Sequence, residues 1–470
     1  MYSNSGVDSS YNQGIYLSSF GLGSDKIILD FDSDCLKAGF SGEYKPLIKI
    51  PLRKEQQVIQ DDFCETSFRL SPSKIGLFEN PLRENDLKVI NQVLKLTLID
   101  LYKKYLLLDS RLRKVVIVES PSLPDPIKKL ISKILLKDMF VPSITFFPGS
   151  LMSLMTLGKL EGLVVECGFN QTSITPVFDG RPLELYSKST SIGYSQIQTH
   201  LSNLLCKHAT YSLKGSENKS LLSDSILTFE LTSHIIDNFM FASPLSPPLE
   251  LIVDKNSPKT ERYYNVTSDF LFDWYQQNCM ASDIEFTWKT LSEVPITISI
   301  PGWIRERIFE LFFFGDFASD LLGIVPLIVK IMKSVPVDLR RTLISQILVV
   351  GGLSVIPNLR LRILKDLVTL LLSDDRCKPL ADSAALCDEV DPALQIDSVE
   401  NDITSTINKN DVFNSHEKDT KNVHYKNSGL VFSPLNRAWI GTSIATSANI
   451  NGFEISLDNF DEFGVSSQYM

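Results

Sequence analysis

Short continuous apolar runs alternate along the chain with longer stretches whose apolar residues recur every three or four positions. Continuous runs are typical of buried strands, and the three-to-four spacing is typical of helices that pack by one face. Strands are predicted at 27–29, 36–40, 115–118, 162–166, 173–178 and 347–350, and helices at 86–108, 126–137, 151–157, 316–333, 337–346 and 359–372. This alternation predicts an α/β fold.

Two strand–turn–strand units show the same order of features. In the first, an apolar strand reaches Asp30, and a polar turn leads into a returning strand. In the second, the strand ends at Glu166, and Asp179-Gly180 later marks a hairpin turn. The likeness is compatible with an internal duplication of one α/β unit. A strand followed by an acid and a turn is also common in unrelated folds, so the pattern alone leaves both interpretations open.

The composition is that of a globular protein with a sizeable core. Of 470 residues, 43% are hydrophobic and 22% are charged, and such a length predicts roughly two to four lobes. The 46 basic residues are outnumbered by 56 acidic ones, which gives a net charge of −10. No basic excess exists to neutralise nucleic-acid phosphates, and no apolar run is long enough to cross a bilayer. We therefore expect neither a nucleic-acid partner nor a membrane span.

Several segments fall outside the regular pattern. The seven cysteines and five histidines are scattered without CxxC or HExxH spacing, which predicts a reducing, intracellular compartment and no metal site. Residues 1–25 are polar and do not resemble a secretory signal, so we expect a flexible extension there. Residues 376–429 are rich in acids, Ser and Asn, which predicts an acidic, disordered insertion.

The first turn is a candidate phosphate site, because successive backbone N–H groups in such turns form a concavity for anions. It contains Ser33, and Lys37 follows on the returning strand. The turn has no glycine, and Asp32 and Asp34 stand where a phosphate would bind. Like charges about 5 Å apart cost roughly 3 kcal/mol at an effective dielectric near 20. A solvated acidic turn is therefore the favoured interpretation.

The second turn and a glycine pair are weaker candidates. Glu166, beside Gly168, is suited to holding Mg²⁺ through water, and it is equally suited to capping its own turn. Gly351 and Gly352 follow a β-branched strand and precede a helix, where backbone can pass close to a flat ligand. Close packing between helix and strand explains the glycine pair equally well. No Ser, His or Asp lies in the spacing of a nucleophile elbow.

Six segments in order resemble actin and its relatives. They are 29–42 (LDFDSDCLKAGFSG), 115–121 (VVIVESP), 162–180 (GLVVECGFNQTSITPVFDG), 337–357 (VDLRRTLISQILVVGGLSVIP), 439–443 (WIGTS) and 455–464 (ISLDNFDEFG). The resemblance implies the duplicated actin/Hsp70/sugar-kinase fold, with two lobes around a nucleotide cleft. It places the first lobe at 26–160 and 430–470, with a reduced second subdomain at about 52–82, and the second lobe at 161–375.

The chain departs from actin where actin hydrolyses ATP. The resemblance places Gly149 at the water-positioning Gln, Ser173 at the nearby His, and Glu166 at the Asp that orders magnesium waters. A group that orients the attacking water is needed for hydrolysis, so we expect no enzymatic activity. The residues left in a degenerate cleft are Ser33, Lys37, Glu166, Gly168, Gly351 and Gly352. No cofactor is expected to be required, and a trapped ATP or ADP with Mg²⁺ stays an alternative.

Within the actin family, 105–158 and 334–357 are most similar to the actin-related proteins at the pointed end of dynactin, the ten/eleven class. This resemblance implies a cytoplasmic, cytoskeletal subunit that caps the actin-like filament of dynactin. Its partners would be the filament subunit, the pointed-end accessory subunits and, indirectly, dynein. Two alternatives stay open, a nuclear actin-related subunit of a chromatin-remodelling complex and an ATPase on the same fold.

Overall fold

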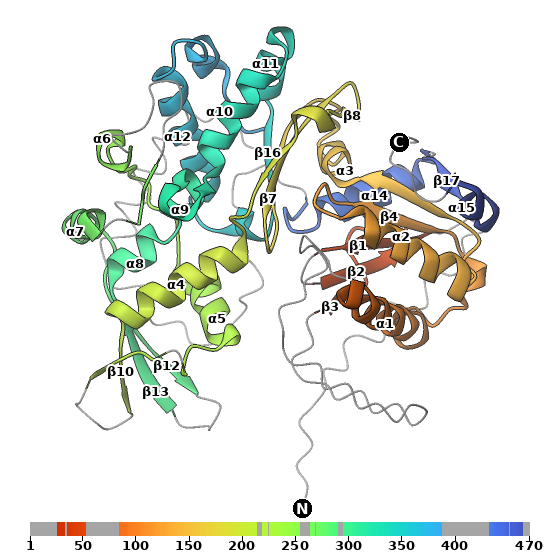
Figure 1. Ribbon diagram of the computed structural model, residues 1–470, viewed down its shortest axis with the longest axis horizontal. Helices are drawn as coiled ribbons and strands as arrows, with labels where there is room; N and C mark the ends of the chain where they lie inside the picture. The colour runs from red at the N-terminus through yellow and green to blue at the C-terminus, as the bar shows by residue number, and fades with distance from the viewer. Residues whose placement is uncertain are drawn as a thin grey trace, which may run out of the picture.

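The protein has two lobes joined by a narrow middle (Figure 1). The computed structural model describes residues 26–32, 35–52, 84–213, 219–223, 225–253, 264–267, 269–289, 295–387, 432–450 and 452–463. The predictions for 1–25, for Ser33 and Asp34, for nearly all of the second subdomain and for 388–429 lie outside the described residues. No helix in the described ranges is long and apolar enough to cross a membrane.

Lobe one, which comprises the described residues up to 160 and those from 432 onward, is built on a six-stranded sheet. The strand order is β17 (Glu454–Ile455), β5 (Ile144–Pro148), β4 (Val115–Glu119), β1 (Ile27–Phe31), β2 (Cys35–Phe40) and β3 (Ile48–Pro51). Ile27, Leu29 and Phe31 face one layer of helices, whereas Ile28 packs with Trp439 on the other side. Successive side chains of a strand point to opposite faces, so a continuous apolar run fits a sheet covered on both sides.

The helices of lobe one divide between the two faces of this sheet. Helices α1 (Glu84–Asp100) and α2 (Asp125–Lys133) cover one face, and each continues into a π-helical turn, Leu101–Leu106 and Ile134–Asp138. Helices α3 (Gly149–Met155) and α14 (Arg437–Ser447) cover the other face, and α15 (Leu457–Phe463) follows β17. Met152 of α3 packs on the sheet of lobe one and Leu154 packs on that of lobe two, so α3 lies between the lobes.

Lobe two, residues 162–387, contains an inner and an outer sheet. The inner sheet runs β16 (Ile347–Gly351), β6 (Gly162–Cys167), β7 (Thr172–Phe178) and β8 (Arg181–Pro182), with β9 (Lys188–Thr190) paired to β7. The outer sheet runs β11 (Ser220–Leu221), β10 (Thr210–Leu213), β13 (Pro295–Ile300) and β12 (Ile284–Lys289). The helices are α4 (Tyr194–His208), α5 (Phe229–Phe239), α6 (Leu249–Ile252), α7 (Asp269–Gln277), α8 (Gly302–Arg307), α9 (Glu310–Phe314), α10 (Ile324–Ser334), α11 (Val337–Ile344) and α12 (Leu359–Leu372).

The two lobes repeat one unit. In lobe one, β1 pairs antiparallel with β2 and parallel with β4. In lobe two, β6 pairs antiparallel with β7 and parallel with β16. The hairpin that ends β7 has positive φ at both Asp179 and Gly180, as the turn with the right twist for a hairpin requires. The predicted α/β fold with two duplicated lobes is confirmed.

Two predicted segments differ from the structure. The helix expected at 316–333 begins only at Ile324, because Gly315, with a φ of 85°, starts a small hairpin of β14 (Gly315–Asp316) and β15 (Leu321–Leu322). Residues 376–387, which the sequence pattern assigns to the insertion, pack on lobe two. Cys377 and Leu386 are buried there, and Leu386 forms a bridge with Ile347.

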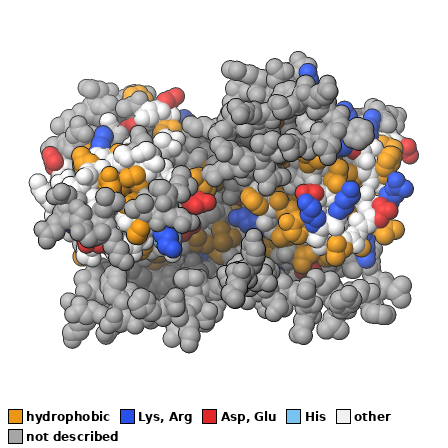
Figure 2. Space-filling model, turned by 90° about the horizontal axis from the view of Figure 1, so that it is seen from below, with side chains coloured by type: hydrophobic (Ala, Val, Ile, Leu, Met, Phe, Trp, Pro, Cys, Tyr) orange, Lys and Arg blue, Asp and Glu red, His pale blue; other side chains and the backbone are white. Residues whose placement is uncertain are grey.

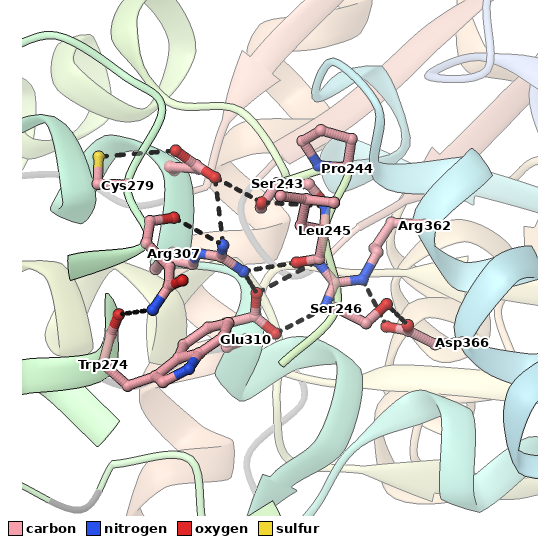
Figure 3. Close-up of polar contacts among 12 residues, drawn as sticks. Ser243, Pro244, Leu245, Ser246, Trp274, Cys279, Arg307, Glu310, Arg362 and Asp366 are labelled. Atoms are coloured by element: carbon pink, nitrogen blue, oxygen red, sulfur yellow. Dashed lines mark hydrogen bonds and ion pairs between the residues drawn. The ribbon is translucent and has the colours of Figure 1, made fainter. Parts of the chain in front are cut away.

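A network of buried charges crosses the core of lobe two (Figure 3). Arg362 of α12 donates to Asp366 at 2.7 Å and to Glu310 of α9 at 2.8 Å. Arg307 of α8 donates to Glu310 from the other side at 3.2 Å. The side chains of all four residues are at most 2% exposed. The network therefore ties α8, α9 and α12 together.

Candidate functional site

The turns of the two repeated units face one another where the lobes meet. A small pocket between them is lined by Asp32, Ser120, Ser122, Glu166, Gly168, Asn170, Gln171 and Ser173. Its cavity volume is about 10 Å³, roughly the room that one water molecule needs. From below, the molecule is hollowed between the lobes, with hydrophobic side chains in the hollow (Figure 2).

The first turn brings Lys37 against the carboxylates of its own hairpin. Its Nζ lies 3.2 Å from Asp30 Oδ2 and 3.9 Å from Asp32 Oδ2, and it donates to the carbonyl of Leu435 at 3.1 Å. Burial lowers the pKa of Lys37, but the two carboxylates outweigh burial and raise that pKa overall. Burial also raises the pKa of Asp30, against the effect of Lys37. The lysine is charged and already bound to three oxygens.

The second turn places Glu166 beside lobe one. Its Oε1 accepts a hydrogen bond from Ser120 Oγ at 3.1 Å, a direct contact between the lobes. Its Oε2 is buried and has no hydrogen-bond partner among the described residues. Burial, followed by repulsion from Asp32 and Asp30, raises the pKa of Glu166 to about 7. Two carboxyl groups, those of Asp32 and Glu166, therefore line the pocket.

The three glycines of the predicted site have different surroundings. The N–H of Gly168 donates to the carbonyl of Gln171 at 3.0 Å, which closes the second turn. Gly351 has a φ of 94°, and a Cβ there would lie 2.3 Å from the carbonyl oxygen of Cys167. A Cβ on Gly352 would meet no atom within 4 Å. Close packing of β16 on β6 accounts for Gly351, and Gly352 borders open space.

We predict opposite outcomes for two neighbouring glycine substitutions. Gly351→Ala should lower the free energy of unfolding by at least about 2 kcal/mol, because its φ and ψ are essentially restricted to glycine and the added Cβ clashes with Cys167. Gly352→Ala should change it by less than about 0.5 kcal/mol. Urea unfolding of both variants measures the difference, and equal effects would contradict this interpretation of the pair.

The structure brings together part of the predicted site. Glu166 and Gly168 line the pocket, and Lys37 reaches its edge through Asp32. Gly351 and Gly352 end the neighbouring strand, where Gly351 is in register with Cys167. Ser33 lies outside the described residues. Ser120 was not predicted from the sequence, although it follows the carboxyl end of parallel strand β4, the usual place for functional side chains in such sheets.

These residues fit a nucleoside triphosphate poorly. Lys37 is occupied by two carboxylates and a carbonyl, and the Gly168 amide is used within its turn. Glu166 and Asp32 add negative charge to a pocket with room for about one water. Within the described parts of the chain, no group of three or more His, Cys, Asp or Glu side chains is placed to hold a metal ion.

Comparison with known proteins identifies the family. The actin family profile matches residues 21–231 and 264–389, and the chain belongs to the actin family. It is 22% identical over 303 residues to actin-related protein 4 of Arabidopsis thaliana, covering 60% of this chain and 64% of that protein. It is 23% identical to actin-related protein 10 of Dictyostelium discoideum, covering 45% and 46%. It is 22% identical to centractin of Saccharomyces cerevisiae, covering 78% and 88%. The matches to the first two relatives thus span about half to two thirds of those proteins.

Proposed function

We propose that the protein is a non-catalytic actin-related subunit of dynactin that caps the pointed end of the actin-like filament. In that place it would support dynein-driven transport along microtubules and the positioning of nuclei and spindles. The observation that carries the non-catalytic part of the proposal is the acidic pocket between the lobes, where Ser120 donates a hydrogen bond to Glu166. Such a subunit needs the shape of an actin but no nucleotide turnover.

The positions that the family resemblance assigns to the water-positioning Gln and the nearby His carry neither side chain. Gly149 has no side chain, and Ser173 presents only a hydroxyl to the pocket. Lys37 and Glu166 hold positions where the family resemblance implies phosphate and magnesium contacts, yet each is bound to other protein groups. The hydrogen bond between Ser120 and Glu166 joins the two lobes directly.

Nucleotide assays test the non-catalytic part of this proposal. The purified full-length protein should release no phosphate from ATP above the level of a buffer blank, and 1 mM ATP with Mg²⁺ should leave its Tm unchanged. A ligand at 100 times its Kd would stabilise the fold by about 2.7 kcal/mol, which a thermal scan resolves. Conventional actin is the positive control. Turnover that Glu166→Ala abolishes would establish the ATPase alternative instead.

Affinity purification from cells tests membership of the complex. The tagged protein should recover the dynactin filament subunit and the pointed-end accessory subunits in quantitative mass spectrometry. A second tagged actin-related protein from the same cells, of known nuclear location, serves as the matched control. Recovery of chromatin-remodelling subunits without dynactin would overturn the proposal in favour of the nuclear alternative.

A further inference from the structure

Four large apolar side chains are exposed on two loops of lobe one. Tyr105 is 44% exposed, Leu107 68%, Leu112 69% and Phe140 55%. The loops contact each other, because Ser110 Oγ donates to the carbonyl of Met139 and the Arg111 guanidinium lies 5.4 Å from the centre of the Phe140 ring. We call these four side chains the loop patch. Single exposed apolar residues are ordinary, whereas neighbouring ones mark interaction sites.

The backbone holds two members of the patch in an unusual conformation. Leu107 has a φ of 51° and Phe140 a φ of 56°, and bulky residues rarely adopt positive φ. Leu107 directly follows the π-helical turn Leu101–Leu106, and Phe140 lies two residues beyond the turn Ile134–Asp138. Isolated π-helical turns occur frequently at functional sites. In both adjoining loops, therefore, a π-helical turn is followed by a residue with positive φ whose apolar side chain is exposed to solvent.

The charges around the patch are mostly basic in an acidic protein. Residues 101–114 and 137–140 contain six Lys or Arg and two Asp, whereas the whole chain has a net charge of −10. Lys104 pairs with Asp100 and Lys114 with Glu454. Lys103 and Arg111 make no ion pair with described residues. The patch therefore offers apolar contact area together with two cations ready for carboxylates.

From this combination we propose that the loop patch docks an acidic, apolar segment of a partner protein. The partner would place aliphatic or aromatic side chains on Leu107, Leu112 and Phe140, and carboxylates beside Lys103 and Arg111. A membrane is a poorer match, because each cation near an anionic surface contributes only about 1 kcal/mol and Asp109 is exposed beside Arg111. The proposal does not depend on which complex the subunit serves.

Fluorescence anisotropy with a defined probe tests this surface. The probe is a labelled 16-residue synthetic peptide with leucines on one helical face and glutamates on the other, and its control carries lysines in place of glutamates. The full-length protein should bind the acidic peptide and not the basic one. Leu112→Ser with Phe140→Ser, or Arg111→Glu alone, should weaken binding at least tenfold.

Matched variants separate the patch from general surface effects. Leu221→Ser and Arg181→Glu change exposed residues of lobe two and should alter binding less than twofold. The melting curves of all variants should coincide, because every replaced side chain is exposed or partly exposed. Equal binding by all variants, or no binding to wild type, would contradict the proposal.

Two further outcomes would assign the patch to another occupant and overturn the proposal. The first is sedimentation of the protein with phosphatidylserine vesicles that the patch variants abolish. The second is tighter peptide binding after Asp388, Glu389 and Asp391 are neutralised in the full chain, since that would show the acidic stretch from 388 already covering the patch.

Discussion

Replacing Arg362 by methionine is expected to lower the free energy of unfolding of lobe two by about 3–5 kcal/mol. Arg362 is fully buried, and its guanidinium supplies a cation to Asp366 and to Glu310 (Figure 3). Breaking a buried ion pair by removing one partner leaves a charge without compensation, which is far more costly than losing an exposed pair. For a lobe of this size, the corresponding fall in Tm is about 6–20 °C.

Calorimetry or urea unfolding of two further variants gives this prediction its control. Arg341→Met removes an exposed arginine whose Nε bonds only the Ser383 hydroxyl, and it should change stability by less than about 0.5 kcal/mol. Adding Asp366→Leu to Arg362→Met removes the stranded carboxylate and should recover part of the loss. If the single Arg362 variant behaves like Arg341→Met, the network does not stabilise the fold as we infer.

Replacing Glu166 by glutamine is expected to stabilise the protein at pH 8 by up to about 3 kcal/mol and at pH 5 by less than about 1 kcal/mol. Burial and the neighbouring carboxylates raise the pKa of Glu166 to about 7, from a usual value of 4.5. Each unit of difference between folded and unfolded states corresponds to 1.36 kcal/mol. The folded state therefore binds the proton more tightly than the unfolded chain does.

The direction with pH follows from that difference. Well below pH 4.5 Glu166 is protonated in both states, so it carries no penalty there. As the pH rises toward 7, Glu166 ionises in the unfolded chain but stays largely protonated in the folded protein. Wild type therefore loses stability that the glutamine variant keeps. Thermal scans of both proteins between pH 5 and 8 measure the effect. Glu184→Gln, at an exposed position, is the control. A glutamine variant less stable than wild type at pH 8 would show that the carboxylate is needed in its charged form.

Continuous apolar runs made much of the fold predictable from sequence. The strands that contain Ile28, Val116, Val164 and Val349 are covered by side chains on both faces, and such strands have no polar alternation to obscure them. The helix predicted at 316–333 was wrong in its first part, because an apolar run fits a buried strand or a buried helix equally well. Only the close packing of the chain at that glycine, a tertiary feature, decides between them.

The candidate site was less predictable than the fold. Glu166, Gly168 and Lys37 could be named because each lies next to its own turn, where local pattern is informative. Ser120 is distant from Glu166 in sequence, and their hydrogen bond exists only after the lobes meet. The buried Arg307 and Arg362 were also missed, since arginine is almost never fully buried unless paired, and pairing across helices leaves no sequence signal.

The sheet of lobe one is assembled from both ends of the polypeptide. The indole N–H of Trp439 donates a hydrogen bond to the carbonyl of Ile28 in the central strand β1. The edge strand β17 comes from residues 454–455. During synthesis, lobe two is complete on the ribosome while lobe one still lacks α14. The apolar face formed by Ile28, Val116 and Val118 is therefore exposed to solvent until α14 is made. Exposed apolar faces of this kind promote aggregation. Newly made chains of this protein should thus depend on a chaperone until the residues of α14 have left the ribosome.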